Sequence, residues 1–93
     1  MREIEIKYPS WYDELAELEH EKKGFLEGVL VSSEGADMKL NFYDMTRFAQ
    51  DSADSIRDNG LFYISNVVIV ESVSRRHIEA AAQRIVKDGL ASC

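Results

Sequence analysis

The segment that most constrains the fold is the run Val67–Val70, which is apolar at every position. A strand with one wet face alternates apolar and polar residues, so a strand without alternation needs cover on both of its faces. Two kinds of cover are open: the helix that follows the strand folds under the sheet, or a second copy of the chain packs on it. Alternatively, a tight turn or bulge at Ser65-Asn66 divides residues 61–72 into two short strands, which would place the last strand at a sheet edge.

Periodicity predicts three further strands. Residues 2–8 alternate charged and apolar side chains, which places the isoleucines on one face of a half-buried strand. Segments 25–33 and 38–44 flank the turn-forming sequence SEGAD and are rich in apolar and aromatic residues. Together these two segments predict a hairpin.

Three helices are predicted from polar caps, apolar stripes of helical spacing and glycines at their ends. The predicted N-caps are Ser10, Asp44 and Ser74. The predicted ends are Gly24, Asn59-Gly60 and Gly89. The second helix has an apolar stripe of Met45, Phe48, Ala49, Ser52 and Ile56, and the third has one of Ile78, Ala81, Ala82, Ile85 and Val86.

The predicted order is therefore β-α-β-β-α-β followed by an additional C-terminal helix, which is typical of the α+β class. Two crossovers that flank a hairpin indicate a ferredoxin-like, split β-α-β sheet, in which right-handed connections put both crossover helices on one face. A length of 93 residues suits a single core. We therefore expect residues 1–93 to form one α+β domain.

The cysteine content and the N-terminus bear on the cell compartment. The one cysteine, Cys93, cannot form an intrachain disulfide, so packing alone holds the domain, which favours a reducing compartment. The first nine residues lack the apolar core of a secretory signal, and the longest aliphatic run is too short to span a bilayer. We expect a cytoplasmic protein with no membrane partner.

The net charge of −6 is unevenly distributed along the chain. Residues 1–60 hold 14 acidic against 7 basic side chains, whereas residues 61–93 hold 3 against 4. Nucleic-acid binding depends on neutralising phosphates with Lys and Arg, so this distribution disfavours a nucleic-acid partner. A charged protein partner is expected to be basic.

The first predicted helix offers a candidate partner-binding face. At about 100° per residue, Trp11, Leu15 and Leu18 face the core and the opposite face is polar. Like-charge pairs four residues apart on that polar face are unfavourable, and a basic partner would offset their cost. The predicted partner-binding residues are Trp11, Tyr12, Asp13, Glu17, His20 and Glu21. The alternatives are a solvated face, or a metal site at Glu17 and His20, for which the chain lacks the second Glu-x-x-His pair of a di-iron centre.

A second candidate site is the sequence VSRRH at the start of the third helix. Cations at a helix N-terminus oppose the helix dipole, and such a mismatch can be retained where an anion binds the free N–H groups. The candidate anion-binding residues are Ser74, Arg75 and Arg76. The alternative is an ordinary junction, in which Ser74 caps the helix and Arg76 points to water. His77 has no cysteine or second histidine at a ligand spacing, so no metal is expected there.

The sequence lacks the common catalytic motifs. It has no Walker loop, no dinucleotide fingerprint and no serine in a glycine-bracketed elbow, and Cys93 lacks the fixed surroundings of a nucleophile. A small polar site on the sheet, built from Glu27, Asn41, Tyr43 and Tyr63, is left open. We expect a protein that is not an enzyme and needs no cofactor or metal.

The leading functional prediction is a non-catalytic interaction protein, of the immunity or inhibitor kind, that binds a basic protein partner through the acidic helix face. The first alternative is a sensor of small anions at the start of the third helix. The second is a structural homodimer. It would form through the uncovered face of the sheet, or by the acidic first helix against the basic stripe of Arg76, Arg84 and Lys87.

Overall fold

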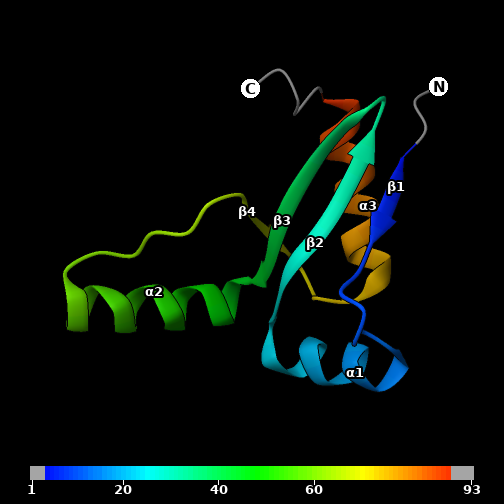
Figure 1. Cartoon of the computed structure of the whole chain (residues 1–93). Coiled ribbons are helices and arrows are strands. Elements are labelled where there is room, and N and C mark those ends of the chain that lie inside the picture. The colour runs from blue at the N-terminus through cyan, green and yellow to red at the C-terminus, as the bar shows by residue number, and fades with distance from the viewer. Residues whose placement is uncertain (1–3, 89–93) are drawn as a thin grey trace.

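The computed structural model describes residues 4–88, which form four strands and three helices in an α+β arrangement (Figure 1). In chain order the elements are β1 (Glu5–Lys7), α1 (Glu14–Lys23), β2 (Phe25–Ser33), β3 (Ala36–Asp44), α2 (Met45–Asn59), β4 (Val67–Val70) and α3 (Arg75–Lys87). This order matches the predicted one. The predicted helix end at Gly89 and the cysteine at position 93 lie outside the described residues.

The sheet is mixed, and its strands lie in the spatial order β1-β2-β3-β4. β1 pairs antiparallel with β2, β2 pairs antiparallel with β3, and β3 pairs parallel with β4. The predicted ferredoxin-like order is not confirmed, because only β3-α2-β4 joins parallel strands by a crossover. β1 and β2 are direct neighbours, and α1 lies at one end of the sheet (Figure 1). Polar side chains of α1 hold it there by binding the residues just before and at the start of α3.

The predicted hairpin of β2 and β3 is confirmed, and Glu34-Gly35 forms its turn. These two residues have φ values of 52° and 82°, as a type I′ turn requires. A bulge shifts the pairing between Leu26 and Val29. Within it, Gly28 has a φ of 79° and donates its N–H to Asn41 Oδ1 at 3.0 Å. The extra residue lets Leu26 and Val29 both face the core.

Two predicted helix boundaries meet at the joint between α1 and α2. Gly24 ends α1 in the left-handed conformation, and its carbonyl accepts the N–H of Asp44 at 2.9 Å. Asp44 caps α2 as predicted, since its Oδ1 accepts the N–H of Arg47 at 2.7 Å. The predicted end of α2 at Gly60 is also confirmed. The C-terminus of α1 is therefore tied to the N-terminus of α2.

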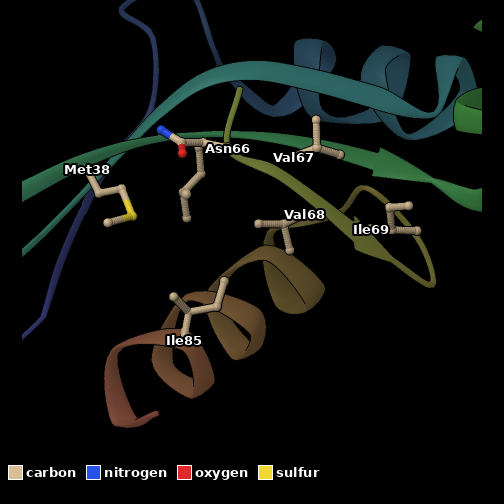
Figure 2. A pocket seen from close by; sticks show the side chains of 7 residues that line it. Met38, Asn66, Val67, Val68, Ile69 and Ile85 are labelled. Atoms are coloured by element: carbon tan, nitrogen blue, oxygen red, sulfur yellow. The ribbon is translucent and has the colours of Figure 1, made fainter. Parts of the chain in front are cut away.

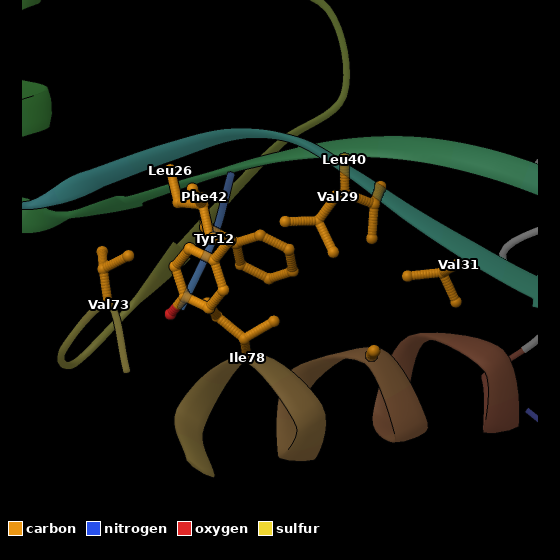
Figure 3. Packing of buried hydrophobic residues seen from close by; sticks show 9 residues of the cluster. Tyr12, Leu26, Val29, Val31, Leu40, Phe42, Val73 and Ile78 are labelled. Carbon is orange, nitrogen blue, oxygen red and sulfur yellow. The ribbon is translucent and has the colours of Figure 1, made fainter. Parts of the chain in front are cut away.

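The hydrophobic core lies between the sheet and α3 (Figure 3). Its buried members are Tyr12, Leu26, Val29, Val31, Leu40, Phe42, Val73, Ile78 and Ala82. The predicted apolar side of α3 is confirmed, because Ile78 and Ala82 are buried and Ile85 packs beside them. The third helix thus covers one face of β4, where Val68 and Val70 point. On the other face Ile69 is 41% exposed. β4 is therefore covered on one face only, and not on both faces as its sequence predicted.

Helix α2 projects away from the sheet instead of covering it (Figure 1). None of its residues is buried, although its apolar stripe has helical spacing. Phe48 is its main attachment, with ring centroids 6.1 Å from Tyr43 and 5.5 Å from Phe62. Residues 61–64 form no strand, so the predicted division of residues 61–72 gives one strand only. Asn66 has a φ of 54° and lies in a bend, and β4 lies at the edge of the sheet. Both observations agree with the alternative in which a turn at Ser65-Asn66 divides this segment.

Candidate functional site

The two sequence regions that were predicted as separate sites contact each other in the structure. Glu17 Oε2 accepts the backbone N–H of Arg75, the first residue of α3, at 3.0 Å. Glu17 Oε1 also lies 3.8 Å from Arg75 Nε. One turn further along α1, Glu21 Oε2 accepts the hydroxyl of Ser72 at 2.9 Å. The anion that this helix N-terminus binds is therefore a carboxylate of the chain itself.

Arg75 is held in this junction by aromatic rings as well as by Glu17. Its guanidinium carbon lies 5.3 Å from the ring centroid of Tyr8 and 5.2 Å from that of Tyr12. The two tyrosines stack on each other, with ring centroids 4.8 Å apart. The remaining candidate cation, Arg76, is exposed. The unfavourable interaction of Arg75 with the dipole of α3 is thus offset by contacts within the molecule.

Burial perturbs the tyrosines of this cluster. It raises the pKa of Tyr8, and the hydrogen bond from Tyr8 Oη to Glu79 Oε2 at 3.0 Å raises that pKa further, because it stabilises the protonated phenol. Burial also raises the pKa of Tyr12, and the nearby charge of Glu17 acts in the same direction. Both phenols therefore stay protonated at neutral pH.

The orientation predicted for α1 is wrong. Trp11, Leu15 and Leu18 were expected in the core, yet they are 53%, 65% and 58% exposed. The polar side faces the protein, where His20 donates from Nδ1 to the carbonyl of Phe25 at 2.8 Å. On that side Glu17 accepts the first N–H of α3 and Glu21 accepts the hydroxyl of Ser72, so the leucines point away from the protein.

The residues predicted to bind a partner are therefore divided. Tyr12 is only 8% exposed and belongs to the core. Asp13, not Ser10, caps α1, because Asp13 Oδ1 accepts the N–H of Ala16 at 2.8 Å. His20 lies against the ring of Trp11, with centroids 5.1 Å apart. Glu17 and Glu21 bind the α3 junction, and the exposed members of the set are Trp11, Asp13 and Glu21.

The face of α1 that points to solvent combines apolar and acidic side chains. Leu15 and Leu18 are three residues apart and lie on one side of α1, whereas Trp11 precedes the helix and its ring lies against His20. Exposed Glu14 and Glu19 flank the leucines. We call Glu14, Leu15, Leu18 and Glu19 the α1 outer face. The leucines were visible in the sequence, but no sequence signal separates an outward from an inward leucine on a helix without a dominant apolar side.

Ser74, His77 and Glu71 form a local chain of contacts that resembles a nucleophile with its base. Ser74 Oγ lies 2.8 Å from His77 Nδ1, and His77 Nε2 lies 3.6 Å from Glu71 Oε2. Ser74 makes no side-chain cap bond because this hydroxyl is engaged by the imidazole. The carboxylate of Glu17 occupies the first N–H of α3, where an oxyanion would need stabilisation. The arrangement therefore suits a structural junction better than a catalytic site at which negative charge develops.

Two further possibilities raised by the sequence were a metal site and a polar site on the sheet. Within residues 4–88, no three His, Cys, Asp or Glu side chains gather as a metal site would require. Of the polar residues considered on the sheet, Asn41 contacts the bulge and the carbonyl of Ser65, while Tyr63 is exposed. Over the same described range, no helix has both the length and the apolar composition needed to cross a bilayer.

Comparison with known proteins adds no relative. Neither a family model nor a curated protein nor a solved structure matches the chain significantly. The functional assignment therefore depends on the geometry of the described residues.

Proposed function

We propose that this chain is a non-catalytic interaction module that binds a protein partner through the α1 outer face. The observation that carries the proposal is the exposure of two leucines, Leu15 and Leu18, on one side of α1, with Trp11 exposed in the turn that precedes the helix. Scattered apolar residues are ordinary on surfaces, but neighbouring exposed leucines on one helix face, with an exposed tryptophan close to them in the chain, favour a binding surface.

The opposite side of α1 explains why this face is presented rigidly. Glu17 and Glu21 bind the α3 junction, His20 binds the carbonyl of Phe25, and Gly24 joins the helix to α2. A helix fixed on its polar side loses little conformational freedom when a partner binds the outer side. The exposed leucines are thus arranged for contact at a small entropic cost.

The charge around the face indicates the chemistry of the partner. Exposed carboxylates of Asp13, Glu14 and Glu19 surround the apolar group, with exposed Lys22 and Lys23 at the C-terminal end of the helix. A complementary partner would present an apolar patch with basic residues at its rim, and long-range attraction would speed its association. An inhibitor of the immunity kind, acting in the cytoplasm on a basic protein, is one form of this function.

The test is capture of a partner from the native cell with matched surface variants. Replacing Leu15 and Leu18 by serine should abolish capture of any partner that the wild-type chain retains, whereas Ile56→Ser should not. Ile56 is a suitable control because it is 56% exposed and also on a helix, but lies on α2. Charge reversal at Glu14 and Glu19 should weaken capture most at low salt. A partner retained equally by all variants would refute the proposed surface.

The contacts of α1 also decide which charge reversals are informative. Glu17 and Glu21 hold the fold through Arg75 and Ser72, so reversing them would perturb the helix junction as well as any docking. The alternative function, a sensor of small anions at Ser74, Arg75 and Arg76, would require the ligand to displace Glu17. The bound carboxylate favours the interaction module over that sensor.

A further inference from the structure

We infer that β4 is a dimerisation edge, at which Val67–Val70 pairs antiparallel with the same strand of a second copy of this chain. The proposal does not depend on the α1 outer face. β4 is the last strand of the sheet, opposite β1, and among the described residues it pairs only with β3. None of its four residues is charged or proline, the usual features that protect an exposed edge from pairing.

The backbone groups that face outward on this edge can be derived from one hydrogen bond. The carbonyl oxygen of Asn66 points toward β3 and accepts the N–H of Asn41 at 3.0 Å. Since a trans peptide points its N–H opposite to its carbonyl, the N–H of Val67 faces away from β3. Strand alternation then turns the polar groups of Val67 and Ile69 outward, and those of Val68 inward.

This outward pattern is complementary to itself. If Val68 of each copy lies at a two-fold axis, Val67 of one copy stands opposite Ile69 of the other, and each such pair can exchange both an N–H and a carbonyl bond. A two-fold axis requires the same surface on both subunits, which this arrangement satisfies. The sheets of the two copies would then form one continuous sheet.

An apolar groove lies where the second strand would place its side chains. It has a volume of about 490 Å³ and is lined by Met38, Val68 and Ile85, with Asn66 at its rim (Figure 2). β4 covers only the Asn41–Asp44 half of β3, so the groove lies beside the uncovered half. The same register sets Val70 of the second copy opposite Asn66, with its side chain on the α3 side of the sheet. That valine would enter the groove.

Charge also favours a second copy at this edge. The chain carries a net charge of −6, so two copies repel wherever their carboxylates meet. Residues 61–70 contain no charged side chain at all. The register places Glu71 of the second copy opposite Ser65, next to Asn66, whose Nδ2 donates to the carbonyl of Lys39 at 3.0 Å. The segment of residues 61–70 therefore presents no carboxylate to that glutamate.

Pairing at the edge would also bring apolar side chains of the two copies together on the face that α3 does not cover. Ile69 is 41% exposed on the face that α3 does not cover, and exposed Leu61 and Tyr63 precede it in the same uncharged segment. Bringing two such segments together would remove apolar surface from water on both copies. Ile69 would thereby gain an apolar neighbour, Val67 of the second copy, on the face that one chain leaves exposed.

The primary test is sedimentation velocity of the full chain over a range of concentrations, combined with amide hydrogen exchange. We expect a monomer–dimer equilibrium. In the dimer, the amides of Val67 and Ile69 should become protected, whereas in dilute monomer they should exchange rapidly while those of Val68 and Val70 stay protected. A chain that remains monomeric at every concentration overturns the proposal. So does a dimer in which Val67 and Ile69 remain unprotected.

A matched pair of variants separates edge pairing from simple apolar contact. Ile69→Pro removes only an outward N–H, which an edge strand tolerates, and should weaken the dimer about tenfold or more. Ile69→Thr keeps the N–H and should weaken it much less. Equal effects of the two variants, or none from either, would overturn the edge pairing. If Ile69→Pro fails to fold by circular dichroism, the exchange pattern of the wild-type chain still decides.

Discussion

Helices α1 and α2 flank the same glycine joint, yet they are attached to the sheet by opposite means. α1 has no dominant apolar side and is held by polar contacts of Glu17, His20 and Glu21, with its leucines in solvent. α2 has a clear apolar stripe, yet no residue of it is buried, and it projects from the sheet (Figure 1). The comparison shows that apolar periodicity predicts which residues form a helix face, whereas hydrogen-bond partners decide which face is used.

The largest expected effect is at the joint itself. A Cβ added at Gly24 would lie 2.7 Å from Asp44 Oδ2 and 2.8 Å from Arg47 Cβ, and the position has a φ of +82°. Gly24→Ala should therefore lower the free energy of unfolding by about 3 kcal/mol, since it combines left-handed strain with loss of the α2 cap. Urea unfolding measures this change.

Gly60→Ala is the matched control for the joint. Gly60 has a similar φ of +85°, but an added Cβ would have no neighbour within 4 Å. Only the backbone strain remains, so a loss of about 1 kcal/mol is expected. Equal losses at the two glycines would contradict the close contact between α1 and α2.

The next effect concerns the aromatic attachment of α2. Phe48→Ala removes ring contacts with Tyr43 and Phe62 and should cost about 2 kcal/mol, less than for a fully buried phenylalanine. Hydrogen exchange should accelerate across α2 and leave α3 protected. Met45→Ala, at an exposed position of the same helix, should change stability by less than about 0.5 kcal/mol. A uniform acceleration of exchange would mean that α2 is not a separate unit.

A smaller effect is expected for the polar attachment of α1. Glu17→Ala removes a charged acceptor from the first N–H of α3 and should lower stability by about 1.5 kcal/mol. Glu19→Ala, at an exposed position of the same helix, should have an effect within about 0.5 kcal/mol. Thermal unfolding of both variants provides the measurement. If the two glutamates prove equivalent, the junction does not hold α1.

The smallest change in the free energy of unfolding at neutral pH is expected from the ionisation of three tyrosines. Burial raises the pKa of Tyr8, Tyr12 and Tyr43, so the folded state binds these phenol protons more tightly than the unfolded state does. Their contribution is fully present below the unfolded pKa of about 10 and is lost as the pH rises above it. Stability measured by urea unfolding should thus fall in alkaline solution, and Tyr8→Phe should flatten that fall. An unchanged slope would show that Tyr8 ionises freely.

Much of the local structure could be predicted because its causes are local. The alternation of residues 2–8, the SEGAD turn, the cap at Asp44 and the helix ends at Gly24 and Gly60 each depend on neighbours in the chain. The order of strands in space could not be predicted in the same way. It depends on which strand edges meet, and the alternating pattern of β1 is compatible with more than one neighbour.

The candidate site shows the same division. The sequence indicated two unfavourable charge arrangements, an acidic first helix and cations at the start of the third helix. In the structure these two features stabilise each other, because Glu17 binds Arg75. What could not be foreseen was that they would meet. Glu17 and Arg75 are far apart in the chain, and only the packing of α3 across the sheet brings α1 to its N-terminus.

By itself, the amino-acid sequence determined the types and order of the elements, their turns and most of their caps, because hydrogen bonds within a few residues set these. Only the tertiary structure decided the strand order, the outward turn of Leu15 and Leu18, and the half-covered state of Val67–Val70. Those outcomes depend on competition between distant groups for the same partners. The free N–H groups of α3 selected the polar side of α1, and that selection left the leucines in solvent.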